Sequence, residues 1–457
     1  MRPSPIKLKE RQMTVLIYDK GSLLLRGETG TPYGHWDPRV DAFRVMSIYY
    51  PDVLSFLDKS RIFYRDEAAD PLPLPSLSCR VELRSYQISA LDAWFEVGGR
   101  GVIVLPTAAG KTFIALKAIE KLNVATLIVV PTLDLLDQWR QHLIDQFRVD
   151  VGIIGGGENV LKPLTVSTYD SAYIKAEYLG NKFMFIVFDE VHHLPAPSYS
   201  QIAEMYIAPY RMGLTATYER EDGLHLDLPR LVGGCVYQLE VDDLAGKHLS
   251  SYTHEKILVK LTPTEQLEYQ REYAVFRSYL KKNRILLKNR KDFQRFIMRT
   301  GRDPQARKAL LARNKALKIV LNSESKIKAL GEFLSIYTKE KFLIFTRFNQ
   351  LVYRISQQFF IPAITYQTSR EERKEILEKF KAGKYRAIVT SQVLDEGIDV
   401  PDASIGFILS GTGSSREYIQ RLGRILRKRP GKRAKLIEIV AQETLETRIS
   451  QRRHRLR

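Results

Sequence analysis

LPTAAGKT (residues 105–112) is the string that decides the fold of the central part of this chain. The apolar run GVIV (residues 101–104) precedes it, and FIALKAIEKL (residues 113–122) follows with the apolar spacing of a helix. A strand, a glycine-containing turn and a helix in this order predict a phosphate-binding loop. Backbone N–H groups at a helix N-terminus cradle phosphate oxygens, and the helix dipole favours negative charge. In such a loop Lys111 reaches the β- and γ-phosphates and the Thr112 hydroxyl holds Mg²⁺.

A second string supplies two acids that the loop lacks. FMFIVFDEVHH (residues 183–193) has the pattern of a buried strand that ends on Asp189 and Glu190. Asp189 is expected to hold the metal and Glu190 to act on water. Each string alone has a plainer alternative. Leu105 stands where the full loop pattern has its first glycine, and an acidic pair at a strand exit can be merely solvated. The two strings together favour an ATP site.

The composition is that of a globular protein with more than one domain. The chain has 457 residues, 44% of them hydrophobic, which suffices for two or three cores. Its two cysteines lie far apart without metal-like neighbours, so no disulfide framework or zinc site is expected, and a reducing compartment suits them. No window approaches 18 uninterrupted apolar residues, so we expect a cytoplasmic protein without membrane association.

The net charge of +19 is concentrated in two segments. Residues 271–320 carry 16 Lys and Arg against 3 Asp and Glu, and residues 421–457 carry 13 against 3. The remainder of the chain is close to neutral. Two basic segments on near-neutral domains predict a polyanion partner, and we expect nucleic acid. Solubility alone is the plainer explanation, but an even spread of charge would serve it better.

Apolar runs alternate with amphipathic helical segments in two stretches of the chain. This alternation predicts α/β domains with parallel sheets, because strands buried on both faces are apolar almost throughout. The runs are GVIVLP, ATLIVVP, VGIIGG, LTVST and MFIVFDE in the first stretch, and KFLIF, AITYQ, RAIVTS, SIGFILS and AKLIEIV in the second. Between the stretches, residues 261–320 favour a helical hairpin with a break at RTGRDPQ (residues 299–305). Its interleaved aromatic side chains either pack in a core or stack on bases.

The N-terminal part lacks the regular alternation of apolar runs and helical segments. It has short β-like runs, TVLIY and SLLLRG, and a helix is expected within residues 40–59, before the Pro-rich linker PLPLPSL (residues 71–77). We therefore expect a small α/β accessory domain at this end. The expected domains are an accessory domain over 1–75, a first α/β domain over 76–245, a linker with a basic helical insertion over 246–322, and a second α/β domain over 323–457.

A basic string in the second α/β domain explains why an ATPase would need that domain. In YIQRLGRILRKRPGK (residues 418–432), Arg421, Arg424 and Arg427 recur at three-residue steps, so on a helix they share one broad face. An arginine offered to the γ-phosphate stabilises transition-state charge and can contribute ~10³–10⁵ in rate. The alternative is a solvated basic helix.

The whole set of strings resembles the motifs of the superfamily 2 nucleic-acid helicases, in that family's order over about residues 82–430. LRSYQ (residues 83–87) resembles the adenine-contacting motif, LPTAAGKT motif I, and FDEVHH (residues 188–193) motif II. The remaining matches are VVPTLDLLDQW with motif Ia, VSTYDSA with the next DNA-contacting motif, GLTAT with motif III, FLIFTRF with motif IV, TSQVLDEGIDVPD with motif V and QRLGRILR with motif VI.

Within that superfamily the chain resembles the XPB-type repair and transcription helicases. Arg220, Glu221 and Asp222 directly follow GLTATYE and are similar to that group's Arg-Glu-Asp loop. The basic helical insertion is similar to its thumb, and the N-terminal domain to its damage-recognition domain. The resemblance implies two RecA-like motor domains that use ATP and Mg²⁺. It also implies 3'-5' DNA helicase activity in nucleotide excision repair or transcription-linked repair. The expected form is archaeal or bacterial: a nucleoid-associated monomer on duplex, forked or damaged DNA, with a repair nuclease as a further partner.

The resemblance also assigns roles to residues. Catalytic roles fall on Lys111, Glu190, Gln420, Arg424 and Arg427. Nucleotide binding falls on Arg84, Gln87, Thr107, Gly110, Lys111, Thr112, Gly397 and Asp399. Metal binding falls on Thr112 and Asp189. Contact with DNA, or coupling to it, falls on Thr132, Thr168, Thr215, Thr217, Arg220, Glu221, Asp222, Arg347 and Thr390.

Alternative functions stay open at this point. One is a double-strand DNA translocase of superfamily 2 that does not separate strands. Another is a DNA-binding architectural factor with a regulatory ATP site, against which the intact Lys111, Asp189, Glu190 and Arg424 argue. A small-molecule kinase would leave the second α/β domain and the basic insertion unexplained.

Overall fold

The computed structural model describes residues 13–27, 29–220, 222–391, 403–410, 423, 425 and 433–453. The chain forms two compact units, Met1–Glu240 and Val241–Arg457. Within the described parts, no helix combines the length and the apolar character needed to cross a membrane.

In its described residues, the N-terminal domain is a five-stranded sheet with one α-helix. Its elements are β1 (Thr14–Asp19), β2 (Ser22–Arg26), β3 (Gly34–Asp37), β4 (Ala42–Met46), α1 (Tyr50–Lys59) and β5 (Tyr64–Glu67), with the strand order β3-β4-β2-β1-β5. Val53 and Leu57 of α1 pack on Leu16, Leu23 and Leu25 of the sheet. The expected accessory α/β domain is therefore present.

One expectation for this domain needs correction. The helix expected within residues 40–59 starts only at Tyr50, next to Pro51, which is favoured in a first helical turn. The preceding residues, Ala42–Met46, form β4 instead, because they pair with β2 on one side and β3 on the other.

The first α/β domain is built on an eight-stranded sheet in the order β13-β6-β12-β11-β7-β10-β8-β9, parallel except for β9. The five apolar runs of the first stretch form its strands, as predicted, and β9, β12 and β13 add to them. The strands are β6 (Arg100–Val104), β7 (Thr126–Val130), β8 (Gly152–Gly155), β9 (Glu158–Val160), β10 (Leu164–Thr168), β11 (Phe185–Asp189), β12 (Tyr210–Thr215) and β13 (Cys235–Gln238).

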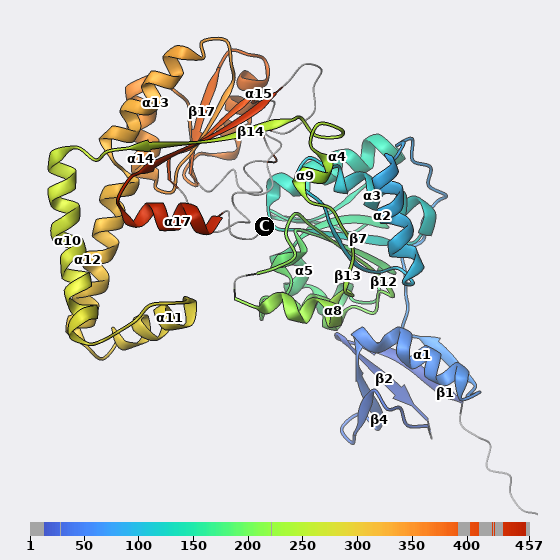
Figure 1. Cartoon of the computed structure of the whole chain (residues 1–457). Helices are drawn as coiled ribbons and strands as arrows, with labels where there is room; N and C mark the ends of the chain where they lie inside the picture. The colour runs from blue at the N-terminus through green and yellow to red at the C-terminus, as the bar shows by residue number, and fades with distance from the viewer. Residues whose placement is uncertain are drawn as a thin grey trace, which may run out of the picture. The chain divides into compact units, whose positions relative to one another are not determined.

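Helices cover both faces of this sheet. The helices α2 (Ser85–Glu96), α3 (Lys111–Leu122) and α4 (Leu133–Phe147) lie on one face (Figure 1). On the other face α5 (Tyr169–Ile174), α6 (Ala176–Leu179), α7 (Ser200–Met205) and α8 (Leu228–Leu231) pack on alternate strand residues, among them Val102, Val104, Leu127 and Val129. This arrangement is the doubly wound fold that the alternation predicts.

Arg211 on β12 is a fully buried cation that ties this second layer of helices together. Its guanidinium donates hydrogen bonds of 2.7–3.0 Å to the backbone carbonyls of Ala203, Tyr206, Ala208 and Leu231. These carbonyls belong to α7, to α8 and to the chain between α7 and β12. Arg211 thus links both helices to the sheet.

We expect Arg211→Met to lower the free energy of unfolding by ~3 kcal/mol or more, since each buried acceptor left without a donor costs ~1–3 kcal/mol. The matched control is Arg230→Met. Arg230 is partly exposed and pairs with Glu204 and Asp227, so its loss should cost no more than ~1 kcal/mol. Denaturant unfolding of both variants measures the difference. Equal losses would contradict the structural role given to Arg211.

The second unit contains a six-stranded parallel sheet in the order β14-β19-β18-β15-β17-β16. Its strands are β14 (Tyr252–Val259), β15 (Phe342–Phe345), β16 (Ala363–Ile364), β17 (Ala387–Thr390), β18 (Ile405–Ile408) and β19 (Ala434–Ala441). Within the described residues, its helices outside the insertion are α9 (Val241–Leu244), α13 (Glu324–Ile336), α14 (Asn349–Phe359), α15 (Arg370–Lys381) and α17 (Leu445–Arg453). All five apolar runs of the second stretch are strands here. β14 lies in the segment expected as a linker, so this sheet starts before the helical insertion.

The basic insertion consists of α10 (Pro263–Lys282), α11 (Arg290–Arg299) and α12 (Pro304–Leu321). Figure 1 shows α10 and α12 side by side as the two arms of the expected hairpin, and α11 is an added helix between them. Phe276 and Phe296 are buried together near the turn, with Tyr273, Tyr279 and Phe293 packed against them. These aromatic residues therefore form a core, which is the first of the two roles considered for them.

Candidate nucleotide-binding site

Strand register brings the motifs of the first α/β domain into one row. In neighbouring strands Thr215 pairs with Val104, Leu214 with Asp189, and Thr168 with Val130. The carboxyl ends of parallel strands meet at the same edge of a sheet, and ligands of α/β folds bind there. The phosphate-binding loop and the acidic pair, separated by more than 70 residues in the sequence, consequently lie at one sheet edge.

The phosphate-binding loop contains two residues with positive φ and is held by helix α2. Gly110 has φ +78° and Ala108 has φ +68°, both in the left-handed region. A Cβ atom on Gly110 would come within 2.5 Å of the Gln87 amide nitrogen, so this position needs glycine. The Tyr86 hydroxyl and the Gln87 amide both donate to the Ala109 carbonyl, at 2.7 and 3.0 Å. Helix α2 thus braces the loop.

Both the oxygen and the nitrogen of the Gln87 side-chain amide form hydrogen bonds within the protein. Its Oε1 accepts the Arg84 backbone N–H at 2.8 Å, and its Nε2 also lies 3.3 Å from the Gly110 carbonyl. Gln87 is buried, and Arg84 lies at the N-cap of α2. These contacts bring both residues beside the loop. Adenine recognition by Arg84 and Gln87 stays a prediction.

Lys111 begins α3, and its ammonium folds back onto the loop. Its Nζ donates to the Leu105 carbonyl at 3.0 Å and to the Pro106 carbonyl at 3.3 Å. Its charge also acts on Asp189 across the row. Thr112 follows directly, so the sequence-predicted phosphate and metal residues lie together at the helix start.

Asp189 ends β11 and is buried. Burial raises the pKa of its carboxyl group, while the Trp139 N–H bond and the Lys111 charge act in the opposite direction. Its Oδ2 accepts the Trp139 indole N–H at 2.8 Å, and its Oδ1 accepts the Glu190 backbone N–H at 3.0 Å. A buried carboxylate oriented by fixed donors suits a hard metal ion such as Mg²⁺.

Glu190, His192 and Thr215 form a short network between motifs II and III. Glu190 has φ +49°, a strained conformation for a residue with a side chain and one that clusters at functional sites. His192 Nδ1 lies 3.1 Å from the Thr215 hydroxyl and 3.4 Å from Glu190 Oε2. The Thr215 hydroxyl also donates to the Thr217 carbonyl at 2.9 Å. The histidine therefore ties the orientation of Glu190 to motif III.

The residues at this edge fit a magnesium nucleotide. The Thr107 hydroxyl oxygen is buried in the loop with no hydrogen-bond partner among the described atoms, so it can serve a ligand. The backbone N–H groups at the start of α3 and the Lys111 ammonium are donors for phosphate. The Thr112 hydroxyl and the Asp189 carboxylate are the oxygen ligands that Mg²⁺ prefers.

The residues predicted to contact DNA, or to couple the site to it, occupy several strand ends. Thr132 and Thr168 cap α4 and α5, accepting the N–H groups of Leu135 and Ser171. Thr217 has a buried hydroxyl without a partner in the described part of the chain. In the second unit, Thr390 ends β17, and Arg347 follows the end of β15 by two residues.

Arg220 points back into its own domain. Its guanidinium pairs with Asp222 and donates a hydrogen bond to the His192 carbonyl. The pairing holds the pKa of Asp222 well below its usual range. The Arg220 guanidinium is therefore already bonded to the His192 carbonyl of motif II and to the Asp222 carboxylate.

Some predicted site residues lie outside the described residues. They are Glu221, Gly397, Asp399, Gln420, Arg424 and Arg427. Ile425 of the same basic string is described. It is buried and packs against Gly406 of β18.

Sequence reasoning missed three supporting side chains. Tyr86 holds the loop, Trp139 holds the Asp189 carboxylate, and the Tyr169 hydroxyl donates to the Asp189 carbonyl at 3.0 Å. A signal for Trp139 was available. It shares a helix face with the apolar Leu136 and Leu143, and a buried indole N–H needs an acceptor.

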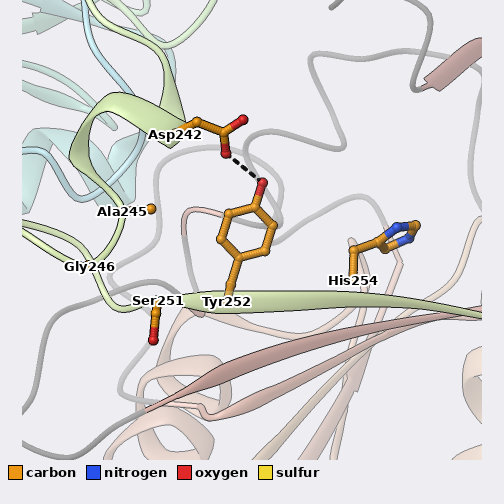
Figure 2. A pocket seen from close by; sticks show the side chains of 6 residues that line it. All are labelled: Asp242, Ala245, Gly246, Ser251, Tyr252 and His254. Carbon is orange, nitrogen blue, oxygen red and sulfur yellow. Dashed lines mark hydrogen bonds between the residues drawn. The ribbon is translucent and has the colours of Figure 1, made fainter.

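A separate pocket lies at the start of the second unit, and Figure 2 shows its lining. The lining residues are Asp242, Ala245, Gly246, Ser251, Tyr252 and His254. The Tyr252 hydroxyl points to Asp242 and donates to its carboxylate at 3.0 Å. None of these described residues is predicted to serve ATP or DNA, so we assign the pocket no part in the nucleotide site.

Comparison with known proteins gives matches along most of the chain. Residues 16–68 match the Xeroderma pigmentosum group B helicase damage recognition domain. Residues 80–220 match the res subunit of type III restriction enzymes, and residues 325–429 match the helicase conserved C-terminal domain. The crystal structure of the Pyrococcus furiosus Hef helicase domain has a similar fold, with a TM-score of 0.53 and 18% identity over 82% of this chain and 99% of that one.

Several curated relatives carry the XPB name, and two of them are described here. The DNA 3'-5' translocase XPB2 of Sulfurisphaera tokodaii is 46% identical over 96% of this chain and 100% of its own length. The DNA 3'-5' helicase XPB of Mycobacterium tuberculosis is 29% identical over 86% of this chain and 66% of its own length. With a relative this similar over its whole length, and with the damage recognition domain matched, the chain belongs to the XPB family of helicases and translocases.

Proposed function

We infer that this protein is an ATP-dependent DNA 3'-5' motor of the XPB type that acts in DNA repair. The observation that carries this inference is the row at the edge of the first sheet. There the phosphate-binding loop, Asp189, Glu190 and the His192–Thr215 contact occupy adjacent strand ends. The arrangement has the parts that phosphoryl transfer to water requires: a phosphate cradle, a metal ligand and a carboxylate for the water.

Each residue has a distinct part in the proposed hydrolysis. Lys111 and the loop N–H groups bind the phosphates, and Thr112 with Asp189 would hold Mg²⁺, which neutralises phosphate charge when bound. Glu190 orients the attacking water and accepts its proton. Arg424 and Arg427 are proposed to supply positive charge for the transition state, with Gln420 beside them on the same basic string.

DNA is proposed to bind through its phosphates rather than its bases. Residues 271–320 carry a large excess of positive charge, and their acids Glu272, Asp292 and Asp303 already pair with nearby cations. The excess is left for a polyanion, and such binding weakens steeply with salt. A repair nuclease as partner, a monomeric state and a cytoplasmic, nucleoid-associated location complete the proposal and rest on the family resemblance.

Translocation without strand separation is the second candidate, and the position of Arg220 favours it. A wedge between bases needs a free side chain, whereas Arg220 is engaged by Asp222 and the His192 carbonyl. Two assays distinguish the candidates. A translocase displaces a third strand from duplex DNA in an ATP-dependent reaction, and a helicase also separates a forked duplex. If neither reaction occurs while ATP is hydrolysed, the motor function is contradicted.

Arg220→Ala should reduce stimulation of the ATPase by DNA, since the side chain links the loop after motif III to motif II. The rate without DNA should stay within about threefold, a shift below ~0.7 kcal/mol in the barrier. Arg230→Ala is the control, because Arg230 also pairs with an aspartate but lies on α8. If Arg220→Ala leaves stimulation by DNA unchanged while fork unwinding is lost, the wedge role is correct and the coupling role is not.

A further inference from the structure

Two aromatic side chains outside motif II converge on Asp189. The Trp139 indole donates to the Asp189 carboxylate at 2.8 Å, and the Tyr169 hydroxyl donates to the Asp189 backbone carbonyl at 3.0 Å. Both side chains are almost completely buried. The residue therefore has its side chain and its main chain fixed by separate donors.

These bonds leave the carboxylate ready for a metal. An ionised carboxylate has about four lone-pair positions on two oxygens. The Trp139 N–H occupies one on Oδ2, and the Glu190 backbone N–H occupies one on Oδ1. The remaining positions can serve Mg²⁺ or its bound water, and rotation of the carboxylate would break the indole bond.

The two donors come from the helices that follow the predicted DNA-contacting threonines. Trp139 lies in α4, which Thr132 caps, and Tyr169 is the first residue of α5, which Thr168 caps. A displacement of either helix therefore changes a bond to Asp189.

We propose that Trp139 and Tyr169 are positioning residues that hold Asp189 in the orientation that Mg²⁺ needs. The proposal rests on the ATPase function inferred above. Outer-shell partners of metal ligands typically contribute 10–100-fold to metal affinity, roughly the scale expected for the direct carboxylate donor Trp139. Tyr169 acts through the main chain and should contribute less.

The chain offers a matched control for each donor. Trp94 is a fully buried tryptophan whose indole donates to the Arg211 carbonyl at 3.0 Å. Tyr206 is a fully buried tyrosine whose hydroxyl donates to the Ala172 carbonyl at 3.1 Å. Replacement by Phe removes a buried donor in all four cases, but only Trp139 and Tyr169 reach Asp189.

The experiment is a Mg²⁺ titration of the full chain with a visible-wavelength fluorescent ATP analogue, read by anisotropy, together with thermal unfolding. Trp139→Phe should raise the half-saturating Mg²⁺ concentration by about tenfold or more. Tyr169→Phe should raise it by a smaller factor. Trp94→Phe and Tyr206→Phe should leave it unchanged even if they lower the unfolding temperature.

Equal Mg²⁺ shifts in Trp139→Phe and Trp94→Phe, or no shift in Trp139→Phe, would overturn the positioning role alone. Absence of any Mg²⁺-dependent binding of the analogue by the unsubstituted chain would contradict the proposed function and, with it, the positioning role. The two failures are therefore distinguishable in one data set.

Discussion

Glu190→Gln should bind ATP with near-normal affinity and hydrolyse it at least ~10²-fold more slowly, the lower end for loss of a general base. The amide keeps the shape of the side chain and its place 3.4 Å from His192 Nδ1, but it cannot accept the proton of the attacking water. Lys111→Ala should behave differently, because Lys111 is proposed to contact phosphate in the ground state. Its loss should weaken both nucleotide binding and turnover.

Nucleotide binding and steady-state hydrolysis, measured on the same preparations, test this separation. Glu120→Gln is the control for loss of a carboxylate in the same domain, since Glu120 pairs with Lys117 on α3 and is not predicted to act on ATP. Near-normal turnover by Glu190→Gln would show that another group activates the water.

Arg424→Ala should lower kcat far more than it weakens ATP binding. An arginine that meets charge only in the transition state can contribute ~10³–10⁵ in rate, and its removal leaves ground-state contacts intact. Although Arg424 lies outside the described residues, its neighbour Ile425 is buried against Gly406 of the second sheet. That packing gives the basic string an anchor on the second α/β domain.

The control for Arg424→Ala is Arg433→Ala, an exposed cation of the same basic segment at the start of β19. This control variant measures how much the loss of one positive charge in the segment weakens DNA binding. An isolated fragment of residues 1–245 should likewise hydrolyse almost no ATP. Full turnover by that fragment, or equal effects of the two arginine variants, would show that Arg424 is not part of the site.

The strands that carry the site residues could be predicted, because a strand buried on both faces appears in the sequence as a continuous apolar run. Val102–Val104 and Phe185–Phe188 are fully apolar runs. The second run ends on the polar Asp189, and the first leads into the glycine-containing loop, at the edge where ligands bind. The loop, Asp189 and Glu190 were therefore found from sequence and lie in one row in the structure. Their chemical roles stay predictions.

The edge strand β14 could not be predicted in the same way. Half of its residues are exposed, and it includes His254, Glu255 and Lys256, so its apolar run is limited to Ile257–Val259. Its partner β19 lies about 180 residues later in the chain, and this pairing alone makes it a strand. Arg211 was missed for a related reason, because a charged residue in a strand gives no sign that four carbonyls surround it.

The Trp139 and Tyr169 contacts with Asp189 needed the structure. Helical spacing predicts that Trp139 is buried, but only the register of β7, β10 and β11 decides which acceptor it meets. The same holds for Arg220. Its sequence position after motif III predicts a place near the nucleic acid, whereas its hydrogen bonds connect it to motif II.

ATP hydrolysis by the full chain, with and without single-stranded, duplex and forked DNA, tests the central claim most directly. The account predicts slow hydrolysis without DNA, clear stimulation by DNA that declines as salt rises, and no stimulated hydrolysis by Lys111→Ala. A chain that binds ATP but hydrolyses it at a rate independent of every DNA substrate would contradict the claim that this protein is a DNA-driven motor.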